Sequence, residues 1–153
     1  MRRLLTTLMV AFAAMTALAQ GSGRIYIEDF EIARDSTVTV TVMLTNNEPT
    51  QGLQFNMRLS QGLEVDEVLL TKYSRKLKMN VSSNLKGDTM IVAVYPMAHT
   101  FFAPDTAGVL TMEVTATPQF EGGNITFWKS QGSSEQFTSI FFDDSSATVT
   151  LLP

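Results

Sequence analysis

The chain has 153 residues, 44% of them hydrophobic, contains no cysteine and carries a formal net charge of −4 at pH 7. The lack of cysteine excludes a disulfide framework and thiolate zinc ligands. The acidic balance argues against nucleic acid and anionic membranes as partners, because both are recognised through a cationic surface.

The first 19 residues have the pattern of an export signal. Residues 1–3 are positively charged, residues 4–16 are mainly apolar, and residues 17–19 (ALA) form a small-x-small cleavage site. The apolar stretch is shorter than the roughly 20 residues that a membrane-spanning helix needs. We therefore predict a signal peptide over residues 1–19 and a mature chain from Gln20 that does not insert into a membrane. Loss of the two arginines takes its formal charge from −4 to −6.

The rest of the chain alternates between apolar and polar side chains with a period of two, which is typical of half-buried antiparallel strands. No window has the period of a useful amphipathic helix. The segments with the strand pattern, in chain order, are 24–32, 37–44, 53–59, 63–73, 77–83, 90–95, 110–117, 124–129 and 147–152.

Turn residues separate these segments. Residues 46–49 (NNEP) end one strand, and residues 86–88 (KGD) are expected at the turn of a hairpin. About nine short strands with polar outer faces predict an all-β fold, an antiparallel sandwich of two packed sheets. We expect a single domain over residues 20–153.

The order of the motifs resembles that of cohesin-like domains over nearly the whole mature chain. The motifs that carry the resemblance are residues 37–47 (TVTVTVMLTNN), 52–59 (GLQFNMRL), 62–65 (GLEV), 107–116 (AGVLTMEVTA) and 122–127 (GGNITF). The resemblance implies a nine-stranded jelly-roll sandwich, exported by bacteria and tied to polysaccharide degradation. It also implies a protein partner bound through a polar sheet face, as cohesins bind dockerin modules.

The sequence offers little catalytic apparatus. A serine or cysteine nucleophile needs a neighbouring base, and the single histidine, His99, has no nucleophile motif around it. A glycoside hydrolase needs two carboxylates across a cleft, and no acidic pair is singled out. We therefore expect no catalytic residues and no enzyme, and keep a carboxylate-based hydrolase as the last alternative.

One pair of acidic residues could bind a metal ion. Asp143 and Asp144, followed by Ser145, are the best calcium ligands in the sequence, since calcium prefers carboxylate and carbonyl oxygens. A polar turn before the last strand explains the same residues without a metal. We expect no resident cofactor, with calcium at this pair as the alternative.

Exposed aromatic side chains are candidates for sugar contacts. If Ile125 and Phe127 lie in the core, the alternation puts Trp128 on the opposite, outer face. The aromatic residues that could join Trp128 are Tyr73, Tyr95, Phe101 and Phe102. The basic residues between positions 72 and 78 are expected on a solvated strand and turn.

The outward row of Gln54, Asn56 and Arg58 is a second candidate surface, and its polarity suits a protein interface. The leading hypothesis is a non-catalytic binding module for a partner protein or a polysaccharide. It would act outside the bacterial cytoplasm, in the periplasm, at the cell surface or in the medium. The alternative is a structural subunit that assembles through exposed strand edges.

Overall fold

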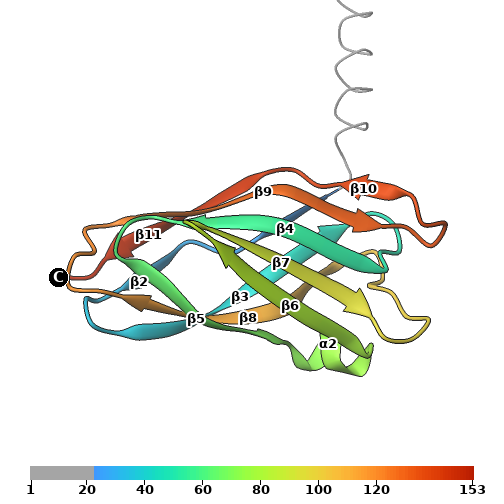
Figure 1. The fold of residues 1–153 in the computed structure, drawn as a ribbon, viewed down its shortest axis with the longest axis horizontal. Coiled ribbons are helices and arrows are strands. Elements are labelled where there is room, and N and C mark those ends of the chain that lie inside the picture. Colours follow the sequence, from blue (N-terminus) through green and yellow to red (C-terminus); the bar gives the residue numbers. More distant parts are fainter. Residues whose placement is uncertain (1–22) are drawn as a thin grey trace, which may run out of the picture.

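A computed structural model describes residues 23–153, so the predicted signal peptide lies outside the described residues. These residues form a sandwich of two packed β-sheets, which confirms the predicted all-β fold (Figure 1). The elements are β1 (Gly23–Tyr26), β2 (Phe30–Ile32), β3 (Thr37–Asn46), β4 (Gly52–Leu59), β5 (Leu63–Leu70), α2 (Lys72–Lys76), β6 (Met79–Lys86), β7 (Thr89–Pro96), β8 (Thr106–Ala116), β9 (Gly123–Ser133), β10 (Ser139–Phe141) and β11 (Ser145–Leu151). Over this part of the chain, no helix has the length and apolar character needed to cross a membrane.

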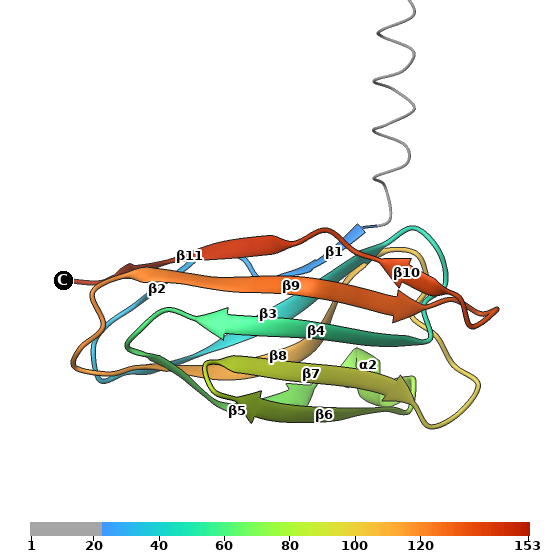
Figure 2. The ribbon, with the colours of Figure 1, turned by 45° about the horizontal axis from the view of Figure 1, so that its top comes forward.

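The two sheets differ in size. The smaller one has the strand order β1-β3-β8-β5, and the larger one has the order β2-β11-β9-β4-β7-β6, with β10 paired to β9. Figure 2 shows β11, β9, β4, β7 and β6 side by side in the larger sheet. The strands pair antiparallel, except that β2 runs parallel to β11. The larger sheet therefore presents one broad outer face built mainly from β9, β4, β7 and β6.

Residues 23–153 contain eleven strands rather than the predicted nine. The expected opening strand, residues 24–32, is two strands: β1 pairs with β3 in the smaller sheet, and β2 pairs with β11 in the larger sheet. Ile25 and Ile32 are both buried, although they belong to different sheets. Alternation alone shows which side chains face inward, and it does not show that the chain crosses from one sheet to the other. The short β10 is the other addition.

The expected strand over residues 63–73 ends at Leu70, and the short helix α2 follows it. The Oγ1 atom of Thr71 caps the helix by accepting a hydrogen bond from the Ser74 amide at 3.3 Å. Ser74 is buried and donates its hydroxyl to the Val109 carbonyl at 2.7 Å. Five helical residues are too few for a helical period to be recognised in the sequence. The predicted strand-and-turn placement of the basic residues was therefore wrong at α2.

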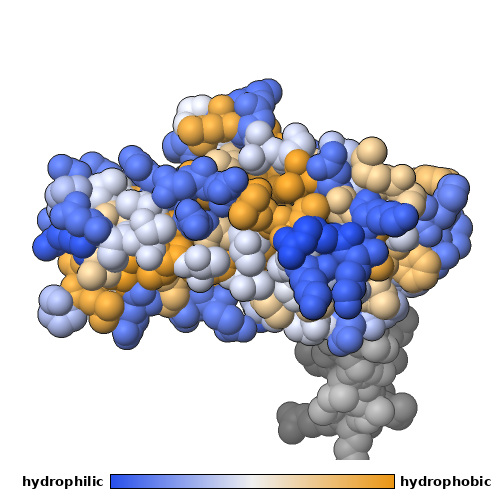
Figure 3. Space-filling view, turned by 90° about the horizontal axis from the view of Figure 1, so that it is seen from below, coloured by the Kyte–Doolittle hydropathy of each residue, from blue (hydrophilic) through white to orange (hydrophobic). Residues whose placement is uncertain are grey.

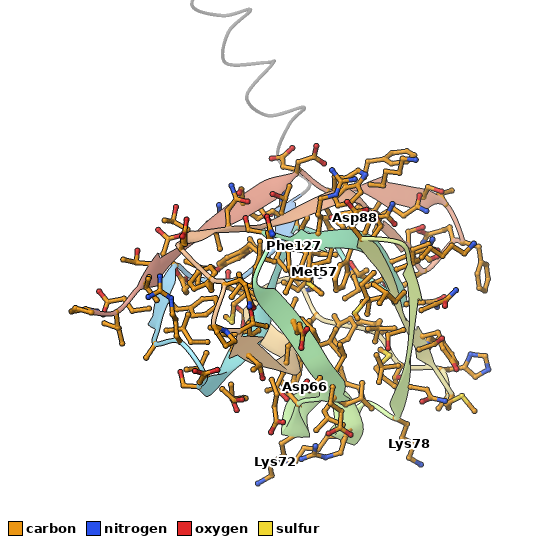
Figure 4. All side chains as sticks on the ribbon, turned by 60° about the vertical axis from the view of Figure 1, so that its left-hand side comes forward. Met57, Asp66, Lys72, Lys78, Asp88 and Phe127 are labelled. Carbon is orange, nitrogen blue, oxygen red and sulfur yellow. The ribbon has the colours of Figure 1, made fainter. Side chains whose placement is uncertain are left out.

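The basic residues nevertheless face solvent, as expected. Lys72, Arg75, Lys76 and Lys78 are all exposed. Figure 3 shows hydrophilic side chains gathered over α2, next to a more apolar area. Lys72 and Lys78 point away from the sandwich in Figure 4. A solvated group of cations explains this surface.

The core lies between the two sheets and fixes which side chains face outward. Phe55 of β4 and Phe127 of β9 are fully buried, and their rings meet edge to face with centroids 5.3 Å apart. Met57 pairs with Phe127 across the two strands, and both lie in the interior (Figure 4). Burying each such side chain stabilises the fold by about 1.5–3 kcal/mol. Because side chains alternate, the intervening residues of β4 must face solvent.

The turn between β4 and β5 has a strict requirement for glycine at position 62. Gly62 has a φ of 90°, and a Cβ atom there would lie 2.6 Å from the Cα of Phe120. We expect Gly62→Ala to lower the free energy of unfolding by at least about 3 kcal/mol, from the unfavourable φ and the clash together. Urea denaturation monitored by circular dichroism measures the loss.

Gly87→Ala is the matched control, because Gly87 also has a positive φ, 63°, but nothing lies within 4 Å of its Cβ position. It should cost only about 1–2 kcal/mol. Equal losses in the two variants would contradict the role given to the contact with Phe120.

Candidate functional site

The two candidate surfaces predicted from the sequence form one surface in the structure. Gln54, Asn56 and Arg58 point outward from β4, because the side chains between them are buried. Asn56 lies directly opposite Trp128 of β9 in the strand register. Trp128 is half-buried, and its neighbours Ile125 and Phe127 are in the core as expected. The outer face of the larger sheet thus combines the predicted aromatic and polar residues.

Arg58 is held between an aromatic ring and a carboxylate. Its guanidinium carbon lies 5.0 Å from the centroid of the Trp128 ring, and its Nε atom lies 3.3 Å from Oδ2 of Asp88. Both charged side chains are more than half exposed. An exposed ion pair contributes only about 0–1 kcal/mol to stability, and an exposed cation–π contact about 0.5–1 kcal/mol. The main effect of these contacts is therefore to orient Arg58 at the surface.

A β-bulge in β9 brings further residues to this face. The β4–β9 register shifts between Gln54 and Asn56, so that Gln54 pairs with Gln131 while Asn56 pairs with Trp128. Lys129 has a φ of 52°, an uncommon conformation for a residue other than glycine. The extra residue puts Trp128 and Gln131 on the same face, although three positions separate them. Nothing in the sequence, such as a glycine at position 129, signals this bulge.

Tyr95 lies on the same outer face, at the other end of β4 from Arg58. It lines a groove of about 440 Å³ together with Gln54, Gln131 and Phe137. The side chain of Tyr95 is 41% exposed and that of Phe137 is 82% exposed. Phe137 and Gln131 were not predicted as site residues. The alternation does not extend into the turn that carries Phe137, and the bulge hides Gln131.

The other aromatic candidates lie elsewhere. Tyr73 belongs to α2 and packs against Phe102, with ring centroids 5.9 Å apart. Phe102 is buried in the core, and its backbone pairs with Thr50. Phe101 is partly exposed in the segment between β7 and β8. Tyr73 and Phe102 therefore have a structural role in packing and do not join Trp128.

Within residues 23–153, no third metal-binding side chain joins Asp143 and Asp144, the predicted calcium ligands. Asp143 and Asp144 are exposed before β11, and the Asp143 amide donates to the Gly23 carbonyl at 3.0 Å. Among residues 23–153, no group of three or more acidic, histidine or cysteine side chains could hold a metal ion. Calcium at this pair stays a prediction. His99 is exposed in the same segment as Phe101.

No protein-family model and no curated protein sequence matches the chain. Solved structures do match it. A non-cellulosomal cohesin from the archaeon Archaeoglobus fulgidus has a TM-score of 0.70 at 13% identity, covering 86% of this chain and 92% of the cohesin. The cohesin module of a Clostridium perfringens family 33 glycoside hydrolase has a TM-score of 0.71 at 11% identity, covering 86% and 99%.

A third similar structure is the cohesin of OlpA from Clostridium thermocellum, solved in a type I cohesin–dockerin complex. It has a TM-score of 0.70 at 12% identity and covers 86% of this chain and 99% of the module. At such low identities, the structural similarity shows a shared fold alone. The cohesin-like resemblance of the ordered sequence motifs is confirmed for the fold. By its fold, the chain is a cohesin-like β-sandwich domain.

Proposed function

We propose that the chain is an exported, non-catalytic binding module that binds a partner protein through the outer face of its larger sheet. The observation that carries the proposal is the oriented Arg58–Trp128 pair on that face. The cohesin-like fold supports the same use, because several neighbours are cohesins solved in complex with dockerins. A dockerin-like module is therefore the first partner class to test.

The composition of the face favours a protein interface. Tryptophan and arginine are the residue types most enriched among those that dominate binding energy. Gln54 and Asn56 on β4 add amides that can both donate and accept hydrogen bonds. Because the Trp128 ring and Asp88 already hold Arg58 in place, a partner loses less side-chain entropy when it binds there.

The charge at one end of the face indicates the chemistry of the partner. Arg58 of β4 and Lys86 of β6 both pair with Thr89 of β7, so they flank it in one outward row. Asp88, the ion-pair partner of Arg58, lies beside this row. A partner that presents carboxylates would meet Arg58, whose side chain is more than half exposed beside Asp88, and also Lys86. Because residues 20–153 carry a formal charge of −6, this attraction is local to Arg58 and Lys86.

Binding of purified dockerin modules tests this proposal. We expect Arg58→Ala and Trp128→Ala each to weaken binding by at least about tenfold, because truncating a central anchor typically costs about 2 kcal/mol or more. Isothermal titration calorimetry gives the dissociation constants.

Arg75→Ala is the matched control, since it removes an exposed arginine from α2, outside this face. It should leave the affinity unchanged. Affinity that is unaffected by both test variants would overturn the assignment of the face. Failure of every dockerin to bind would reject that partner class.

The proposal also places the protein outside the cytoplasm of a bacterium, at the cell surface or in the periplasm or medium, within a polysaccharide-degrading system. Support for export comes from the sequence of residues 1–19. When the full chain is produced in a bacterial host, we expect exported protein whose intact mass corresponds to a chain that starts at Gln20. Ala19→Arg should block cleavage, because the position before the cleaved bond requires a small residue.

Gln20→Ala is the control for this experiment, since it changes the other side of the bond and should leave cleavage intact. Full-length wild-type protein retained in the cytoplasm would refute export by this signal.

A further inference from the structure

The groove beside Tyr95 is lined by aromatic and uncharged polar side chains. It opens on the outer face of the larger sheet, at the opposite end of β4 from Arg58. Its volume of about 440 Å³ lies in the range of about 300–1,000 Å³ that is typical of small-ligand sites. Tyr95 and Phe137 supply aromatic surface, while glutamines and serines supply polar groups. None of the residues that line it is charged.

The hollow exists because two positions in the sheet lack bulky side chains. Gly52 of β4 is the neighbour of Leu53, which pairs with Val94, so Gly52 lies opposite Tyr95. A Cβ atom at Gly52 would come within 3.0 Å of the Val94 carbonyl oxygen. Ala93, which pairs with Gln54, adds only a methyl group. A glycine and an alanine therefore line the groove beside the larger side chains of Tyr95 and Gln54.

Phe137 is fixed in an exposed position by its turn. It adopts a φ of 62°, an unfavourable value for a bulky residue, and leaves 82% of its side chain accessible to water. The buried hydroxyl oxygen of Ser134 accepts hydrogen bonds from the amides of Gln136 at 3.2 Å and Thr138 at 3.1 Å. The backbone of the turn thus places an apolar side chain in water beside the groove.

Paired amides lie in the same groove. Gln54 and Gln131 are direct partners in the β4–β9 register, and both line the groove. Each amide offers donors and an acceptor, so together they can hydrogen-bond to hydroxyl groups, which also donate and accept. An ionic ligand would find no counter-charge among these lining residues.

We propose that this groove binds a neutral carbohydrate, with Tyr95 and Phe137 as platforms for sugar rings and Gln54 and Gln131 as hydrogen-bonding partners of their hydroxyls. A pyranose ring matches this chemistry because it combines apolar C–H faces with a polar edge. This site goes beyond the proposed protein interface, which is centred on the charged end of the face and shares only Gln54 with the groove.

The test is an array of neutral oligosaccharides built from glucose, mannose, xylose or galactose, with oligogalacturonate as the charged comparison. The mature protein, residues 20–153, should bind at least one neutral glycan and should not prefer oligogalacturonate. Tyr95→Ala and Phe137→Ala should each weaken that binding at least tenfold in calorimetric titrations. In NMR titrations, the side-chain amide signals of Gln54 and Gln131 should shift.

Phe141→Ala is the matched control, because Phe141 is 70% exposed on β10 but does not line the groove. It should bind within twofold of the wild type. Arg58→Ala separates this site from the protein interface, since it should weaken dockerin binding and leave glycan binding intact. A blank array, confirmed by NMR at millimolar glycan, would overturn the proposal. Undiminished binding by the Tyr95→Ala/Phe137→Ala double variant would also overturn it.

Discussion

The packing of β4 against β9 determines what the outer face can present. Phe55 and Phe127 meet edge to face inside the sandwich, and Met57 lies opposite Phe127 in the register. Any one-residue slip between the two strands would move these side chains to solvent and bring polar residues into the core. The same contact that stabilises the core therefore fixes Arg58 beside Trp128 on the other side of the sheet.

The bulge at Lys129 is the second constraint, and it gives the face its two unlike ends. In a regular strand, Trp128 and Gln131 would point to opposite sides of the sheet. With the extra residue, Trp128 approaches Arg58 at the charged end, and Gln131 meets Gln54 in the neutral groove. Bulges are over-represented next to functional sites, where they re-aim side chains. Here the conformation of Lys129 affects both ends of the face, because it sets the orientations of Trp128 and Gln131.

The features that could be predicted from the sequence are those that neighbouring residues along the chain determine. Alternation placed Phe127 inside and Trp128 outside, and the residues 86–88 (KGD) marked the turn of the β6–β7 hairpin. Which strands are neighbours depends on long-range pairing. The sequence alone therefore could not show that Trp128 lies beside the outward residues of β4. The split of the opening strand and the helix α2 depend on tertiary contacts, such as the hydrogen bond from Ser74 to Val109. Phe137 was missed because its exposure is set by the turn around Ser134.

The similar structures share the fold at only 11–15% identity, and this fits the physical division of the molecule. The inward-facing positions must stay apolar and well packed, whereas outward positions on the same strands are limited mainly by solubility. A cohesin-like sandwich can therefore keep its core while the chemistry of its outer face changes. In this chain the face joins an oriented Arg58 at one end to an uncharged groove at the other. Because the chemistry of these two ends differs, their ligands should also differ, and each end can be altered without disturbing the core.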